Sequence, residues 1–182
     1  NRYGDCPMST LSVDTIQGKT TGSKVDIAGH VVQVIYAETD TRQSLTSTSY
    51  VDLTGMTATI TPFSTSNKVL VQVCLNIGHQ PVGMNISCQL LRGSTNIFAG
   101  TDTSMKQGFI QTECNLGSGF QYEIKNFTAT TLDAPSTTSA TTYKVQGLIN
   151  TAAGTWYMNR NHSNNSDQGT TKSSITLLEI GQ

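Results

Sequence analysis

Short runs in which apolar and polar residues alternate recur along most of the chain. A period of two residues is that of a strand with one buried face. No window repeats apolar residues at the i, i+3, i+4, i+7 spacing of an amphipathic helix. The pattern therefore predicts an all-β protein. The clearest run is Lys68–Ile77, which places five apolar residues on one face: Val69, Val71, Val73, Leu75 and Ile77.

Clusters of Gly, Asn, Pro and Ser separate these runs and favour turns. Many short strands with turns between them predict a β-sandwich with a jelly-roll-like arrangement. The predicted strands are His30–Tyr36, Ser49–Leu53, Thr57–Thr61, Lys68–Ile77, Ile86–Leu91, Ile97–Ala99, Phe120–Lys125, Thr142–Ile149, Trp156–Met158 and Ser173–Ile180.

The first 28 residues have a different composition. They contain few large apolar side chains and many Thr, Ser, Gly and Asp residues. Such a segment has little core of its own, so residues 1–28 are predicted to form an extended N-terminal arm. Residues 29–182 then form the β-sandwich domain.

Two predicted strands, Val31–Tyr36 and Ile175–Ile180, are apolar on both faces. A strand that is buried on both sides needs a second cover, from a loop or from another subunit. We therefore expect an oligomer whose interface uses these strands. The candidate interface residues are Val32, Val34, Ile35, Ile175, Leu178 and Ile180.

The four cysteines follow no metal-binding or disulfide-scaffold spacing. If Lys68–Ile77 and Ile86–Leu91 form a hairpin, matching their apolar faces places Cys74 and Cys88 on opposite faces of the sheet. We therefore expect all four thiols to be free, which suits assembly in a reducing cytoplasm.

The composition of the chain excludes some classes of binding partner. The chain has 29 Thr and 18 Ser, while charged residues make up 13% and the net charge is −1. Nucleic-acid binding needs a concentrated basic patch, which the scattered Lys and Arg residues do not supply. The sequence contains no apolar stretch long enough for a transmembrane helix and no signal-peptide pattern. We therefore expect neither nucleic acid nor a membrane as a partner.

Motifs for catalysis are missing from the sequence. The three His residues stand in distant segments and outside any HExxH pattern, and there is no GxSxG turn. We expect no enzymatic activity, no metal site and no cofactor.

One segment has the chemistry of a ligand site. Trp156 and Tyr157 precede Asn159, Arg160 and His162 in a polar loop. Aromatic rings with amide and cationic neighbours suit the stacking and hydrogen bonding of a sugar. The alternative is that strand alternation sends one of the two aromatic rings into the core and leaves the other exposed by default. The sequence favours that alternative.

Several phrases, in order, resemble a family of small structural proteins of marine and cyanobacterial phages that are described as tail-fibre-like. The resemblance covers most of the chain except residues 1–8 and about 100–118, and each phrase alone is weak. It implies a role at the virion surface, a β domain after an N-terminal arm, and trimeric assembly. The phrases are STLSVDTIQGKTTG (9–22), HVVQVIYAETDT (30–41), STSYVDLTGMTATITP (47–62), STSNKVLVQVCLNIG (64–78), LLRGSTNI (90–97), LDAPSTTSATTYKVQ (132–146), GTWYMNR (154–160) and SSITLLEI (173–180).

Two roles compete within that resemblance. A tail-fibre or receptor-binding tip would present loops to a glycan on the host surface. A capsid decoration protein would clamp other virion proteins through its arm. A different class of protein, a free carbohydrate-binding module or lectin, is the alternative to both.

Overall fold

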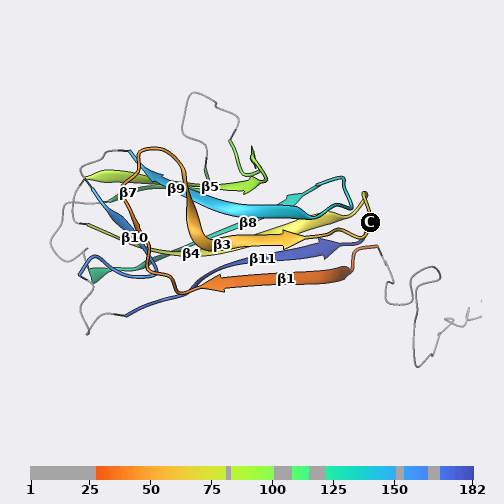
Figure 1. The fold of residues 1–182 in the computed structure, drawn as a ribbon, viewed down its shortest axis with the longest axis horizontal. Coiled ribbons are helices and arrows are strands. Elements are labelled where there is room, and N and C mark those ends of the chain that lie inside the picture. Colours follow the sequence, from red (N-terminus) through yellow and green to blue (C-terminus); the bar gives the residue numbers. More distant parts are fainter. Residues whose placement is uncertain (1–27, 81–82, 101–107, 115–121, 151–153, 164–168) are drawn as a thin grey trace, which may run out of the picture.

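The computed structural model describes residues 28–80, 83–100, 108–114, 122–150, 154–163 and 169–182. In these residues the chain forms two antiparallel β-sheets that pack face to face (Figure 1). The prediction of an all-β, jelly-roll-like sandwich is confirmed. The strands are β1 (Val31–Thr39), β2 (Ser44–Leu45), β3 (Val51–Ile60), β4 (Lys68–His79), β5 (Met84–Arg92), β6 (Thr95–Asn96), β7 (Ile110–Cys114), β8 (Lys125–Asp133), β9 (Thr141–Ile149), β10 (Trp156–Met158) and β11 (Ser173–Ile180).

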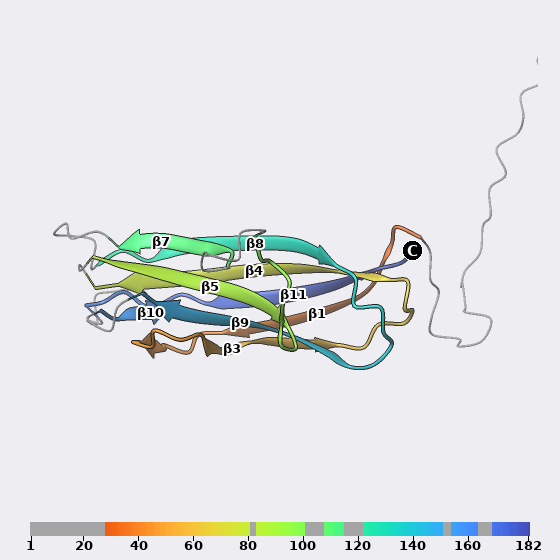
Figure 2. The ribbon, with the colours of Figure 1, turned by 90° about the horizontal axis from the view of Figure 1, so that it is seen from above.

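The chain changes sheet repeatedly as it proceeds. The six-stranded sheet has the order β1-β11-β4-β10-β2, and β8 pairs with β4; the five-stranded sheet has the order β3-β9-β5-β6, and β7 pairs with β5. Figure 2 shows β7 and β8 along one edge of the sandwich, and β1 and β3 along the other. Each long strand thus lies beside partners that are distant in the sequence, which is the jelly-roll-like feature.

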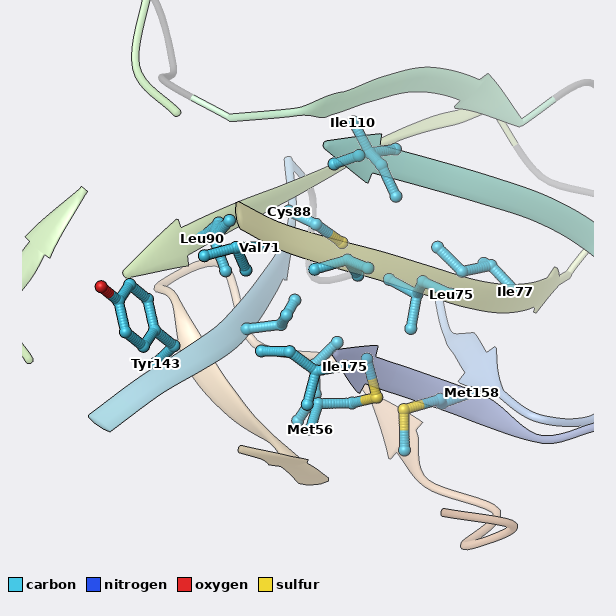
Figure 3. Packing of buried hydrophobic residues seen from close by; sticks show 14 of the residues in the cluster. Met56, Val71, Leu75, Ile77, Cys88, Leu90, Ile110, Tyr143, Met158 and Ile175 are labelled. Carbon is cyan, nitrogen blue, oxygen red and sulfur yellow. The ribbon is translucent and has the colours of Figure 1, made fainter. Parts of the chain in front are cut away.

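The core fills the space between the two sheets (Figure 3). Strand β4 contributes the apolar face that its alternation predicts, and Val71, Leu75 and Ile77 are at most 1% exposed. From the other sheet, Leu90 and Val145 are fully buried opposite them. Burying one such side chain contributes about 1.5–3 kcal/mol, so the facing apolar surfaces account for why the sheets pair.

The condition used for the two cysteines, a hairpin between β4 and β5, does not hold, because the two strands belong to different sheets. Their apolar faces meet across the core instead of lying side by side. Cys88 is consequently buried between the sheets, whereas Cys74 is partly exposed on the outer face, and both are free thiols. Burial raises the pKa of the Cys88 thiol.

Two predicted strands are also wrong in the described residues. No strand covers Tyr122–Ile124; the strand of this region, β8, begins at Lys125. Residues 120–121 lie outside the described residues. The segment Ile97–Ala99 is not a strand either, and the pairing there belongs to β6 at Thr95–Asn96. The runs Ser49–Leu53 and Thr57–Thr61 are parts of the single strand β3, whose register shifts between them.

Backbone hydrogen bonds join the first and last described residues of the domain. The Gly29 amide donates to the Gly181 carbonyl (2.8 Å), and the Gly181 amide donates to the His30 carbonyl (2.9 Å). Strand β1 then pairs with β11 along its whole length. Residues 1–27 lie outside the described residues, so the N-terminal arm and its boundary at residue 28 stay predictions.

A buried carboxylate fixes the register of this pair. The Glu179 side chain of β11 is fully buried and accepts hydrogen bonds from the Phe63 amide (2.7 Å), from Asn67 Nδ2 (2.7 Å) and from Gln33 Nε2 of β1. Gln33 stands directly after a register shift in β1, opposite Glu179. Glu179 thereby joins β1, β11 and the loop between β3 and β4.

We expect Glu179→Gln to lower the free energy of unfolding by about 1–3 kcal/mol, because the new amide group presents N–H where the carboxylate accepted N–H donors. Chemical denaturation with Trp156 fluorescence as the probe measures this, since the chain has 1 Trp. Glu123→Gln is the control. Its carboxylate is exposed and 3.8 Å from Lys125 Nζ, so its change should stay within about 0.5 kcal/mol. Equal effects of the two substitutions would contradict the anchoring role of Glu179.

Candidate functional site on the outer face of the six-stranded sheet

Trp156, the first of the predicted ligand residues, is a core residue. It is fully buried and pairs across the sheet with His79. Its indole reaches the opposite sheet so closely that a Cβ atom at Gly147 of β9 would lie 2.4 Å from Trp156 Cζ2. Trp156 therefore has no free face, and its predicted role as a sugar platform is wrong.

Tyr157 points to the other side of the sheet, but its own neighbours cover it. The Arg160 guanidinium lies 3.8 Å from the centre of the Tyr157 ring, and the His162 ring stacks on it with centroids 5.6 Å apart. The Tyr157 hydroxyl and His162 Nδ1 form a hydrogen bond of 2.9 Å. Tyr157 is 6% exposed. Both aromatic residues are thus buried, whereas the sequence alternative left one of them exposed.

Asn159 has a structural role as well. Its backbone φ of 61° is in the left-handed region, which Asn tolerates better than most residues. Its Nδ2 donates to the Thr39 carbonyl (2.9 Å) and to the Thr41 carbonyl (3.1 Å), and its Oδ1 accepts from Ser173 Oγ (2.6 Å). The fold brings together the five residues predicted from sequence, but they bind one another and the backbone, and leave no platform for a ligand.

The predicted interface residues divide between the two faces of the six-stranded sheet. Ile175 is fully buried in the core, and Ile35 packs against that core, so neither is available to a partner. Val34, Leu178 and Ile180 point outward, and Val32 is partly exposed at the register shift of β1. In each of the strands β1 and β11, therefore, only one face is exposed, and the other packs on the core.

On this outer face four apolar side chains stand next to one another on four adjacent strands. Leu132 of β8 pairs with Leu70 of β4, Leu70 pairs with Leu178 of β11, and Leu178 pairs with Val34 of β1. We call these four residues the apolar row. Its two ends are the most open, since Leu132 is 52% exposed and Val34 is 56% exposed. Val31, at 48%, extends the apolar surface beside Ile180.

Two of the four residues of the apolar row, Val34 and Leu178, were predicted from the sequence as interface residues. Leu70 interrupts the polar face of Lys68–Ile77, and this break in the alternation was the available signal. Leu132 belongs to β8, whose inward residues include Ala129 and Thr131, so its apolar pattern is too weak to identify a strand.

No group of three or more His, Cys, Asp or Glu side chains within the described residues could hold a metal ion. His79 is buried, with Nδ1 bonded to the Gln80 carbonyl at 2.8 Å. No helix long and apolar enough to cross a membrane occurs in the described part of the chain. The apolar row makes the outer face of the six-stranded sheet the best candidate for a functional surface.

Comparison with known proteins finds similarity in fold. No family model and no curated protein matches the sequence. The chain is similar to the crystal structure of the infectious bursal disease virus VP2 subviral particle, with 12% identity and a TM-score of 0.41 over 96% of this chain and 46% of that chain. The structure of the infectious bursal disease virus Gx strain gives 12% identity and a TM-score of 0.40 over 97% of this chain and 41% of that one. The chain thus spans less than half the length of either, and the likeness concerns the fold alone.

We expect Gly147→Ala to destabilise the protein by about 1–3 kcal/mol, because the added methyl group would overlap the buried Trp156 ring. Urea denaturation measures the change. Gly169→Ala is the control, since a Cβ there meets nothing within 4 Å, and its change should be within about 0.5 kcal/mol. If Gly147→Ala were as harmless as the control, Trp156 would not be held against β9.

Proposed function

We propose that the chain is a non-enzymatic structural protein of a phage virion surface, and that it self-associates through the apolar row. The observation that carries the proposal is the alignment of Leu132, Leu70, Leu178 and Val34 across four strands. Apolar residues scattered singly on a surface are ordinary, but contiguous exposed ones mark interaction sites. A second copy of the chain is the simplest partner for such a surface, because most soluble oligomers are built from identical subunits.

Composition and fold support the virion role. A surface of Thr, Ser, Asn and Gln stays hydrated without strong charge, and charged residues are only 13% of this chain. Jelly-roll sandwiches occur in capsid proteins and in lectins. The ordered phrases that resemble phage tail-fibre-like proteins favour the first of these classes, and they imply a trimer that docks on other virion proteins through residues 1–28.

Two virion roles remain distinct within this proposal. A receptor-binding fibre tip would be located at the tail, and a decoration protein would be distributed over the capsid. Antibody labelling of intact particles separates them by position. A free carbohydrate-binding module would be absent from particles altogether, which would refute the proposal.

We expect the wild-type protein to be a trimer at micromolar concentration, and Leu178→Asp to be a folded monomer. The aspartate would place an uncompensated charge in the buried contact, at a cost of several kcal/mol, while in the monomer it would face water. Light scattering gives the mass, and circular dichroism gives the fold.

The matched control is Thr142→Asp, which adds the same charge to an exposed residue on the outer face of the other sheet. Its oligomeric state should equal that of the wild type. A monomeric wild-type protein, or dissociation by Thr142→Asp as well, would contradict association through the apolar row.

A further inference from the structure

A shallow groove lies next to the apolar row, on the same outer face of the six-stranded sheet. It has a volume of about 290 Å³ and crosses β8, β4 and β11. We call it the hydroxyl groove, because hydroxyl groups dominate its lining. The lining residues are Gln72, Val73, Cys74, Thr128, Thr130, Ser174 and Thr176.

Among the described residues that line the groove, Cys74 Sγ accepts a hydrogen bond from Asn126 Nδ2 (3.0 Å), but the amide and hydroxyl side chains have no protein partner. In the described part of the chain, Gln72, Thr128, Thr130, Ser174 and Thr176 form no side-chain hydrogen bond with another protein group. An amide and four hydroxyls, on three adjacent strands, therefore offer both donors and acceptors to a ligand.

The outer face of the five-stranded sheet shows that this is not a general property of exposed strands. There Gln89 Nε2 donates to Gln146 Oε1 (2.7 Å), and Gln146 Nε2 donates to Asp52 Oδ1 (2.7 Å). Thr59 and Thr142 share a hydrogen bond of 2.8 Å between their hydroxyls. Polar groups on that face satisfy one another, whereas those of the hydroxyl groove do not.

An exposed aromatic ring stands beside the groove. Tyr36 of β1 is 58% exposed and pairs with Thr176, whose other cross-strand partner is Gln72. The Tyr36 hydroxyl donates to Glu38 Oε2 (3.0 Å), and Glu38 forms an ion pair with Lys172. These contacts hold the ring at the rim, beside Thr176.

We propose that the hydroxyl groove binds a neutral oligosaccharide. Sugar rings present alternating hydroxyls and apolar C–H faces, and they match a row of hydroxyl and amide groups beside an aromatic ring. None of the seven residues that line the groove is charged. Glu38, the cross-strand partner of the lining residue Ser174, is paired with Lys172, and this pairing, followed by the Tyr36 hydroxyl, lowers the pKa of Glu38. A neutral glycan therefore fits better than an acidic one.

The groove shares no residue with the apolar row, and its distal part lies away from that row. Rows of side chains on one face of a strand are about 6.6 Å apart, so the row of Ser174, Cys74 and Thr128 lies about 13 Å from Leu178 and Leu70. A partner seated on the apolar row would leave this distal part of the groove open.

The experiment is a titration of the full chain with chitohexaose, cellohexaose and maltohexaose, followed by protein NMR and by alkylation of Cys74. At sugar concentrations up to about 5 mM, at least one hexaose should shift the resonances of Gln72, Thr130 and Thr176 and slow the alkylation of Cys74. Tyr36→Ala and Gln72→Ala should each weaken that binding about tenfold or more.

Thr59→Val is the matched control, because it removes a threonine hydroxyl from the outer face of the other sheet, and it should bind like the wild type. Leu178→Asp should also bind, which keeps this result independent of the oligomeric state. The proposal is overturned if none of the three hexaoses shifts these resonances, or if Tyr36→Ala and Gln72→Ala bind as well as the wild type. Resonance shifts confined to Tyr157 and His162 would also overturn the proposal, because they would place the binding site in the loop after β10.

Discussion

The register of β1 on β11 is the constraint on which the functional face depends. Side chains of a strand alternate between faces, so a slip of one residue would turn Val34 and Tyr36 inward and Ile35 outward. Glu179 opposes that slip, because its buried carboxylate accepts a hydrogen bond from Gln33, directly after the irregularity in β1. A buried charge without donors would be costly, so the register that supplies them is strongly preferred.

The same arrangement explains how one sheet face can combine two chemistries. Cross-strand neighbours on four strands form rows, and the character of each row is set by residues far apart in the sequence. The row through Leu178 is apolar, and the row through Thr176 is hydroxyl-rich and ends at Tyr36. An apolar surface suited to self-association and a polar surface suited to a sugar are therefore adjacent without sharing residues.

The aromatic residues of β10 resemble a sugar site in their chemistry, but the fold gives them a different role. Trp156, Tyr157 and Arg160 have the composition of a sugar site, yet the first packs against Gly147 and the other two cover each other. Gly147, on the facing sheet, leaves room for the indole, and the pattern within one strand carries no information about how the two sheets face each other. The residues that do face solvent, such as Gln72 and Thr130, are individually unremarkable in a chain rich in Thr.

The sequence by itself determined the class of fold and the buried face of its strongest strands, because alternation is a local consequence of strand geometry. Strand β4 matches its prediction nearly to the residue, and β8 was missed because its inward residues include Ala129 and Thr131. Only the tertiary structure decided that β4 and β5 face each other across the core, that Ile175 points inward, and that Leu132 completes the apolar row. Pairing between distant strands depends on how all apolar faces are buried at once, and no single segment encodes that outcome.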